Sequence, residues 1–340
     1  MSCDALCSVV RWTGGTLALP SRSQRWGGAL LALTLAVGCG EPLPAETPLA
    51  PGAVRLTIGP LELQPGQEVT KCVTAHLPTT TPIDVVKLQA TQKLSHHIIF
   101  YRELADVPDE ALHSCPPLDL GRNTRVPLFI GEKPTEEFSM PPGVSFHFEA
   151  GQAYTIEGHF LNASTQPVSG SAELVLTPAV PGSATIPADL LFLSATTPLL
   201  TKSYDGLKPG LPPAISGVPT ETTTDPTFYS LSDSLASSKF FALTSHQHQL
   251  GTGFVITKST SAQDPGTPLY QNSDWEHPPL LRFPDEAPLT FGFNEGFRWI
   301  CTYKNTTSRY VTFGQSATTN EMCILWAYYY PGQGFVQLYL

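Results

Sequence analysis

Charged residues are scarce in this sequence, and helical periodicity is missing from it. Only 14% of the 340 residues are Asp, Glu, Lys or Arg, and the net charge is −10. Neutralising phosphates needs clustered Lys and Arg, which the sequence lacks, so a nucleic-acid partner is excluded. No segment has the length and period of a convincing helix. An α-helical or nucleic-acid-binding protein is therefore ruled out.

Turn-forming residues are frequent by contrast, with 33 prolines and 27 glycines. Short apolar or alternating runs recur between them from Val54 onward, a pattern typical of a meander of strands. Prolines and a glycine interrupt the pattern near residues 178–190. We therefore predict an all-β fold of two tandem antiparallel β-sandwich (jelly-roll-like) domains, residues 53–182 and 183–340.

The N-terminus has the features of an export signal. Arg22 and Arg25 precede an apolar stretch, residues 27–39, that is too short to span a membrane. The stretch resembles a bacterial lipoprotein signal with residues 1–38 removed and Cys39 lipidated; the alternative is an ordinary signal peptide cleaved nearby. Both predict an exported protein. It is either held by lipid in the bacterial cell envelope, periplasmic or at the surface, with residues 39–52 as a Pro-rich tether, or secreted.

Cysteine usage agrees with an oxidising compartment. After removal of the signal and lipidation of Cys39, an even set remains: Cys72, Cys115, Cys301 and Cys323. Four cysteines allow three connectivities. Their clustering, two in each half, favours the pairs Cys72–Cys115 and Cys301–Cys323.

Histidines occur in two unusual local patterns. His246 and His248 are two residues apart, so on a strand they share one face and can offer two imidazoles to one metal ion. His96 and His97 are adjacent, so both rings reach one ion only if the strand ends or bulges there, or if different ring nitrogens coordinate. Imidazole ligation suits copper, zinc, iron or nickel and does not by itself select one of them.

The order of these motifs along the chain is more specific than any one of them. The motifs are the HH pair, GHFLN with His159, HQH, and NEMC with Met322 followed by YYYP. In this order, from about Val69 to about Pro331, the chain resembles the copper type II, ascorbate-dependent monooxygenases. This family includes peptidylglycine α-hydroxylating monooxygenase and dopamine β-monooxygenase.

The resemblance implies two copper ions in separate sites, one in each domain. One ion would be held by His96, His97 and His159, and the other by His246, His248 and Met322. Members of the family hydroxylate a C–H bond of a small organic substrate with O2 and electrons from ascorbate, across a solvent-filled cleft between the domains. The alternative is an exported copper-binding lipoprotein without catalysis.

The sequence departs from the peptide-amidating branch at two positions that hold a peptide carboxylate. Thr244 and Trp326 stand where that branch has arginine and tyrosine, and threonine cannot pair bidentately with a carboxylate. Together with Trp275 and Phe283 they predict an aromatic substrate pocket. Glu321, beside Met322, is equally compatible with proton transfer and with a structural hydrogen bond. The histidines outside the motifs are interpreted as ordinary surface or strand residues: His76, His113, His147 and His277.

Overall fold

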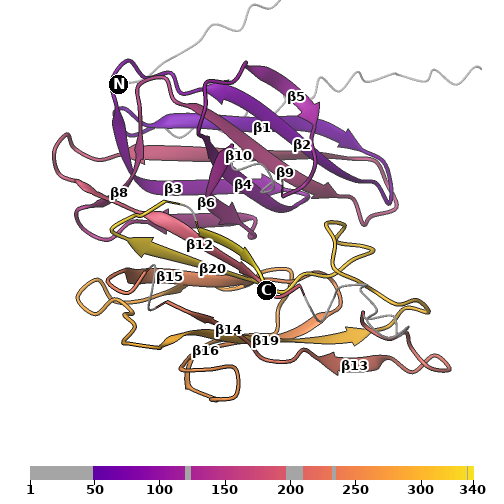
Figure 1. Cartoon of the computed structure of the whole chain (residues 1–340). Coiled ribbons are helices and arrows are strands. Elements are labelled where there is room, and N and C mark those ends of the chain that lie inside the picture. The colour runs from indigo at the N-terminus through magenta and orange to yellow at the C-terminus, as the bar shows by residue number, and fades with distance from the viewer. Residues whose placement is uncertain (1–48, 119–123, 197–209, 232–234, 335) are drawn as a thin grey trace, which may run out of the picture. The chain divides into compact units, whose positions relative to one another are not determined.

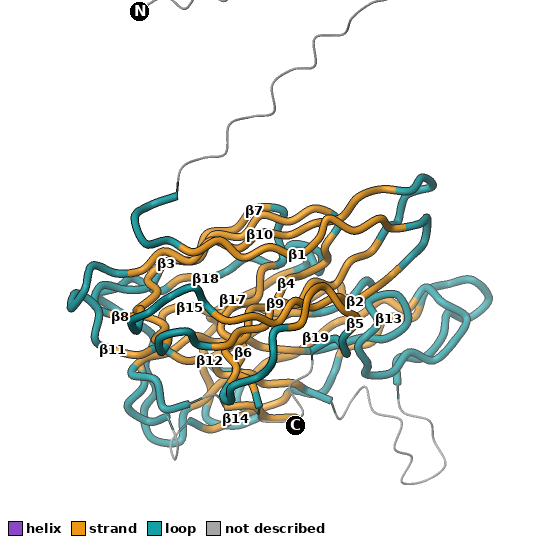
Figure 2. The backbone as a smooth tube through the Cα atoms, turned by 90° about the horizontal axis from the view of Figure 1, so that it is seen from above, coloured by secondary structure: helices purple, strands orange, loops and turns teal. Residues whose placement is uncertain are grey.

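The computed structural model describes residues 49–118, 124–196, 210–231, 235–334 and 336–340. Every regular element within these ranges is a β-strand, as Figure 2 shows, which confirms the predicted all-β class. No helix of the described residues is long and apolar enough to cross a membrane. The signal peptide, Cys39 and most of the tether lie outside the described residues.

The first half of the chain builds two sheets (Figure 1). The first sheet has the order β1-β10-β3-β8-β11, with β7 also paired to β3. Its strands are β1 (Val54–Leu63), β3 (Ile83–Lys93), β7 (Thr135–Ser139), β8 (Val144–Phe148), β10 (Val168–Pro178) and β11 (Ile186–Pro187). The second sheet has the order β5-β2-β9-β4-β6. Its strands are β2 (Glu68–His76), β4 (Ser95–Glu103), β5 (Glu110–Ser114), β6 (Arg125–Gly131) and β9 (Ala153–Leu161).

The second half builds two further sheets, and the chain enters them directly after β11. The third sheet has the order β18-β15-β20-β12-β21. Its strands are β12 (Asp189–Ser194), β15 (Lys239–His246), β18 (Leu281–Arg282), β20 (Ile324–Tyr330) and β21 (Val336–Tyr339). The fourth sheet has the order β13-β19-β16-β17, with β14 also paired to β19. Its strands are β13 (Thr220–Thr223), β14 (Thr227–Ser230), β16 (Gly251–Ser259), β17 (Thr267–Asn272) and β19 (Gly296–Asn305).

Nearly all strand pairs are antiparallel; β11 with β8 and β12 with β21 are parallel. The chain passes from the first sheet to the third between Pro187 and Asp189, shortly after the predicted boundary at residue 182. The sheets of each half enclose an apolar core, which is what a pair of β-sandwiches requires.

The third sheet is buried on both faces, which explains its continuous apolar sequence. Along β20, Ile324, Trp326 and Tyr328 join the core of the first half. The alternate residues Leu325 and Ala327 join the core between the third and fourth sheets. Since neighbouring strand residues point to opposite faces, a strand covered on both sides needs no polar alternation.

The two halves are in direct apolar contact through this sheet. Phe138 of β7 packs against Tyr328 of β20 with ring centroids 4.4 Å apart, and against Phe241 of β15 at 5.8 Å. The Tyr328 hydroxyl also accepts a hydrogen bond from the Ile130 amide at 3.4 Å. Fully burying one such aromatic side chain contributes about 1.5–3 kcal/mol. In this structure the halves therefore hold each other in a fixed register.

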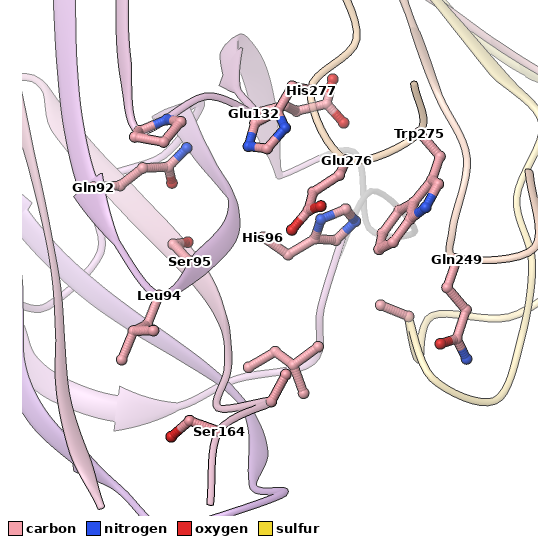
Figure 3. A pocket seen from close by; sticks show the side chains of 14 residues that line it. Gln92, Leu94, Ser95, His96, Glu132, Ser164, Gln249, Trp275, Glu276 and His277 are labelled. Atoms are coloured by element: carbon pink, nitrogen blue, oxygen red, sulfur yellow. The ribbon is translucent and has the colours of Figure 1, made fainter. Parts of the chain in front are cut away.

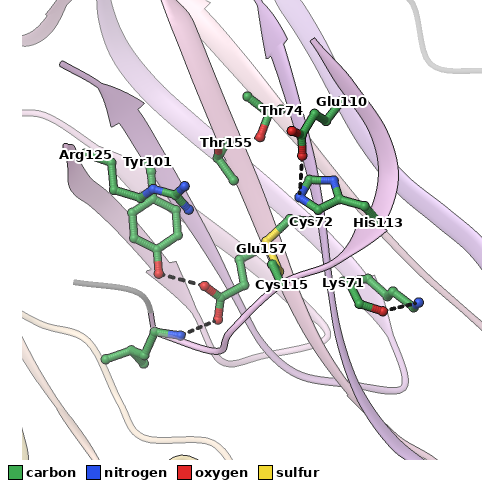
Figure 4. Close-up of a disulfide and its surroundings, with 12 residues drawn as sticks. Lys71, Cys72, Thr74, Tyr101, Glu110, His113, Cys115, Arg125, Thr155 and Glu157 are labelled. Atoms are coloured by element: carbon green, nitrogen blue, oxygen red, sulfur yellow. Dashed lines mark hydrogen bonds and ion pairs between the residues drawn. A yellow bond between two sulfur atoms is a disulfide. The ribbon is translucent and has the colours of Figure 1, made fainter. Parts of the chain in front are cut away.

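Both predicted disulfides are present, and each closes a loop within one half. Cys72 of β2 is bonded to Cys115 after β5 (Figure 4), and Cys301 of β19 is bonded to Cys323 at the start of β20. The second bond ties the residue that follows Met322 to the fourth sheet.

Candidate metal centre

The adjacent histidines reach the same space because the strand bulges between them. In β4, Ser95 is paired with Phe160 and His97 with His159, so His96 lies in a register shift and has no partner of its own. The ring centroids are 5.2 Å apart for His96 and His97, and 5.1 Å for His97 and His159. A bulge re-aims one side chain, and here it brings both neighbouring imidazoles toward the histidine of β9.

The second histidine pair lies at the end of β15. His246 is the last residue of that strand and is paired with Ile324, two residues after Met322. The His246 and His248 rings are 5.2 Å apart. Met322 is 2% exposed, and its carbonyl accepts a hydrogen bond from the Tyr303 hydroxyl at 2.8 Å. The β15–β20 pairing thus brings the H-x-H motif and the methionine to the same strand end.

The two histidine groups lie against each other. The centroid of His246 is 5.3 Å from that of His97 and 5.6 Å from that of His96, while His248 is 5.9 Å from His96. The possible ligand atoms of His96, His97 and His246 lie within 4.8 Å of one another. Five imidazoles, three from the first half and two from the second, therefore form one cluster.

Burial favours the neutral form of four of the five histidines. Burial, together with the neighbouring imidazoles, lowers the pKa of His96, His97 and His248 well below its usual range. The same causes lower the pKa of His246 to about 3. Neutral imidazole is the form that binds metal ions, so these side chains are ready to coordinate at neutral pH.

Several ring nitrogens of the cluster have no hydrogen-bond partner within the described part of the chain. These buried atoms are His96 Nε2, both nitrogens of His97, His159 Nδ1 and His246 Nε2. Leaving buried polar atoms unpaired costs about 1–3 kcal/mol each, unless a ligand satisfies them. Imidazole nitrogens, with the thioether of Met322 two residues from the strand partner of His246, are a donor set that fits copper.

The opposite nitrogens are held by acceptors. His159 Nε2 contacts Glu68 at 2.8 Å, His246 Nδ1 contacts Glu132 at 2.5 Å, and His248 Nδ1 contacts the Asn320 carbonyl at 3.0 Å. Metal-binding histidines almost always donate their second ring N–H in this way, which fixes tautomer and orientation. Glu68 and Glu132 could not be recognised from the sequence, because an isolated glutamate outside any motif has no distinguishing spacing.

Glu68 also joins the two halves. It accepts hydrogen bonds from the Ser316 hydroxyl at 3.1 Å, the Ala317 amide at 2.9 Å and the Thr318 hydroxyl at 2.6 Å. Burial alone would raise its pKa, but the bonds from His159 and Thr318 lower the pKa of Glu68 to about 2. A single carboxylate of β2 therefore orients a histidine of the first half and anchors a loop of the second.

Another buried carboxylate, Glu157, lies two residues before His159. It accepts hydrogen bonds from the Tyr101 hydroxyl at 2.8 Å and the Leu118 amide at 2.9 Å (Figure 4). Its oxygen is 3.9 Å from His97 Nε2, and burial raises the pKa of Glu157. Glu157 is therefore a second polar side chain of β9, in addition to His159, that lies beside the cluster.

Glu321 holds two backbone amides by hydrogen bonds. It is fully buried and accepts the amide hydrogens of His248 at 3.0 Å and Leu250 at 2.7 Å. Burial raises its pKa to about 8. These hydrogen bonds connect the turn after the H-x-H motif to the segment that contains Met322. Gly251 completes that turn, where an added Cβ would lie 2.8 Å from Gln247.

A pocket of about 350 Å³ opens beside the cluster, lined by both halves (Figure 3). His96, Glu132, Trp275, Glu276 and His277 contribute to its wall. The ring of Trp275 is 5.3 Å from that of His96. No Lys or Arg is among the described residues that line this pocket.

The other residues expected in a substrate pocket do not line this one. Trp326 is fully buried and packs edge-on against Phe192 at 4.8 Å. Thr244 is 4% exposed, and its hydroxyl donates to the Pro279 carbonyl at 3.2 Å. Phe283 packs against the core of the second half. Of the four predicted residues, Trp275 alone lines the pocket.

The remaining histidines pair with surface carboxylates. His76 contacts Asp106 and Asp109, His113 contacts Glu110, and His147 contacts Asp84. His277 lines the pocket wall and has its Nδ1 3.9 Å from Asp274.

Comparison with known proteins bears on the second half of the chain. No curated protein shows a significant match. Among solved structures, "Crystal Structure of the STIV MCP" aligns with a TM-score of 0.34 and 9% identity, covering 82% of this chain and 96% of that one. "Cryo-EM Atomic Structure of Broad Bean Stain Virus (BBSV)" aligns with a TM-score of 0.26 and 11% identity, covering 84% and 93%.

A family model is more informative. Residues 211–337 match the model described as copper type II ascorbate-dependent monooxygenase, C-terminal domain. The matched range contains His246, His248 and Met322, the three ligands that the resemblance assigned to this half. Residues 211–337 of this chain are therefore similar to the C-terminal domain of copper type II ascorbate-dependent monooxygenases.

Proposed function

We propose that the protein is a copper-dependent monooxygenase that hydroxylates a C–H bond of a small organic substrate with O2 and ascorbate or another reductant. One observation carries this proposal. Five buried imidazoles converge, several with a ring nitrogen that has no hydrogen-bond partner, in a chain whose second half matches the family model. Copper held there would supply one-electron chemistry and O2 activation.

The candidate ligands fall into two sets, one from each half of the chain. His96, His97 and His159 would hold one copper ion, and His246, His248 and Met322 the other. Five imidazoles and a thioether exceed the four ligands of a tetrahedral or tetragonal site, which supports two ions. The rival arrangement is a single ion shared across the halves by His96, His97 and His246, whose ligand atoms lie closest together. Metal stoichiometry separates the two.

The pocket gives substrate access to the cluster. Its aromatic surface comes from Trp275, and Glu276 adds an acidic side chain to its wall. Aromatic walls favour burial of ring-bearing compounds, and carboxylates disfavour anions. We infer that the substrate is a neutral or cationic aromatic compound in preference to an anionic peptide terminus.

The test is a competition between a phenylethylamine-type compound and a glycine-extended peptide, with copper, ascorbate and ¹⁸O2. We expect ¹⁸O in the hydroxylated amine, more product from the amine than from the peptide, and no product without copper or ascorbate. Faster turnover of the peptide would contradict the inferred substrate. Tight copper binding without turnover of any C–H substrate would favour the alternative function, a non-catalytic copper-binding lipoprotein.

We also propose that Cys39 carries a lipid anchor in the bacterial cell envelope. Stable membrane attachment then depends on the acyl chains. Cys39→Ser should move the protein from the membrane fraction to the soluble exported fraction. Unchanged membrane association of this variant on fractionation would point to another means of retention.

A further inference from the structure

Glu132 belongs to the first half of the chain but contacts a metal-ligand candidate of the second half. It follows β6 directly, and its carboxylate lies 2.5 Å from Nδ1 of His246 at the end of β15. Both side chains are buried, with 4% of Glu132 and none of His246 exposed. The contact is therefore largely shielded from solvent, where a hydrogen bond to a carboxylate is strong.

The backbone around Glu132 is held in place by a second buried side chain. The Gln92 amide, on β3, donates to the Gly131 carbonyl at 3.0 Å and to the Lys133 carbonyl at 2.8 Å. The Glu132 amide donates to the Glu136 carboxylate at 3.2 Å. Peptide groups on both sides of Glu132 are thus fixed, so its carboxylate is aimed before any metal binds.

The direction of the hydrogen bond in this contact selects which nitrogen of His246 is available. With the carboxylate accepting the Nδ1 proton, Nε2 is left unprotonated. Nε2 is also the buried nitrogen of His246 that has no partner among the described residues. A lone pair on that atom is what a metal ion requires.

We propose that Glu132 is a positioning residue that fixes the tautomer and ring orientation of His246, so that the first half of the chain completes the metal ligand set of the second half. This inference rests on the proposed copper function. It assigns Glu132 a role in coordination geometry beyond that of a wall residue of the pocket. It also implies that the second half alone holds copper more weakly than the whole chain.

The experiment compares Glu132→Ala and Glu132→Gln with the wild-type full-length protein. Copper affinity is measured by chelator competition, and the copper(II) signal by electron paramagnetic resonance. Removing an outer partner of a metal-binding histidine lowers affinity about 10–100-fold, which we expect for Glu132→Ala. Glu132→Gln keeps an acceptor for Nδ1–H and should lose less affinity.

One control variant and one further test variant complete the set. Glu137→Ala removes an exposed carboxylate of β7 and should leave affinity and signal unchanged. Gln92→Leu keeps Glu132 but releases its backbone, and should give a partial loss with an altered copper(II) signal. Near-UV circular dichroism of the metal-free variants verifies folding.

A copper-independent reading comes from ¹⁵N resonances of His246 in the metal-free protein. The Nδ1–H tautomer should be present in the wild type and lost or mixed in Glu132→Ala. The inference is overturned if Glu132→Ala retains affinity within about twofold of the wild type with an unchanged copper(II) signal, or if Glu132 itself proves to coordinate copper. A wild type with the expected tautomer but no copper binding would instead refute the proposed function.

Discussion

Replacing Met322 by leucine is expected to weaken one of two bound coppers and to lower hydroxylation by more than about a hundredfold, since losing even an outer partner of a ligand costs about 10–100-fold. Leucine keeps the volume of the buried side chain, so the cost in folding free energy stays below about 1.5 kcal/mol. What is lost is the soft thioether, which favours the reduced state of copper.

Copper content of the loaded protein and product formation check this expectation. Met140→Leu is the matched control, because Met140 is also buried, at 9% exposure, but lies outside the cluster. It should retain two coppers and full turnover. If Met322→Leu loses both coppers together, or if the wild type takes up a single ion, the division of ligands between the halves is wrong.

The sequence predicted the strands and the histidines, but not how closely the histidines meet. For His96 and His97 to reach one ion, the sequence left open a bulge, a strand end or coordination through different ring nitrogens, and the structure has the bulge. The approach of His246 to His97 depends on how the third sheet packs on the first half. That packing is made by Phe138, Tyr328 and Phe241. The sequence of an apolar residue does not reveal which other apolar side chain it will pack against.

The carboxylates behind the histidines were not predictable for a related reason. Glu68 and Glu132 come from β2 and from the residue after β6, far in sequence from the groups that they contact. Neither belongs to a motif with fixed spacing, so chain topology alone brings them to the site.

Trp326 was expected at the site from the sequence, but the structure places it elsewhere. Its position near Met322 suggested a pocket residue, but strand alternation directs it into the core against Phe192.

Removing the Cys301–Cys323 disulfide is expected to cost about 3 kcal/mol of folding free energy, because the bond closes a loop within one half of the chain. The bonded residues are 22 positions apart and fully buried. The paired change Cys301→Ala and Cys323→Ala avoids leaving unpaired hydroxyl groups in the core. For a domain of this size the melting temperature should fall by roughly 6–12 °C, measured in the metal-free protein.

This disulfide should also affect the metal centre, and the other one should not. Cys323 follows Met322 and precedes Ile324, the register partner of His246. Freeing it from β19 gives the methionine segment more conformations, so copper held by His246, His248 and Met322 should bind more weakly while the first site keeps its affinity.

The pair Cys72→Ala and Cys115→Ala is the comparison. Its loop spans 43 positions, and doubling a loop adds only about 0.6 kcal/mol of closure entropy. The two variants should therefore lose similar stability, but only the first should lose copper at the methionine site. Equal copper loss in both would mean that the Cys301–Cys323 bond supports the fold in general and does not position Met322.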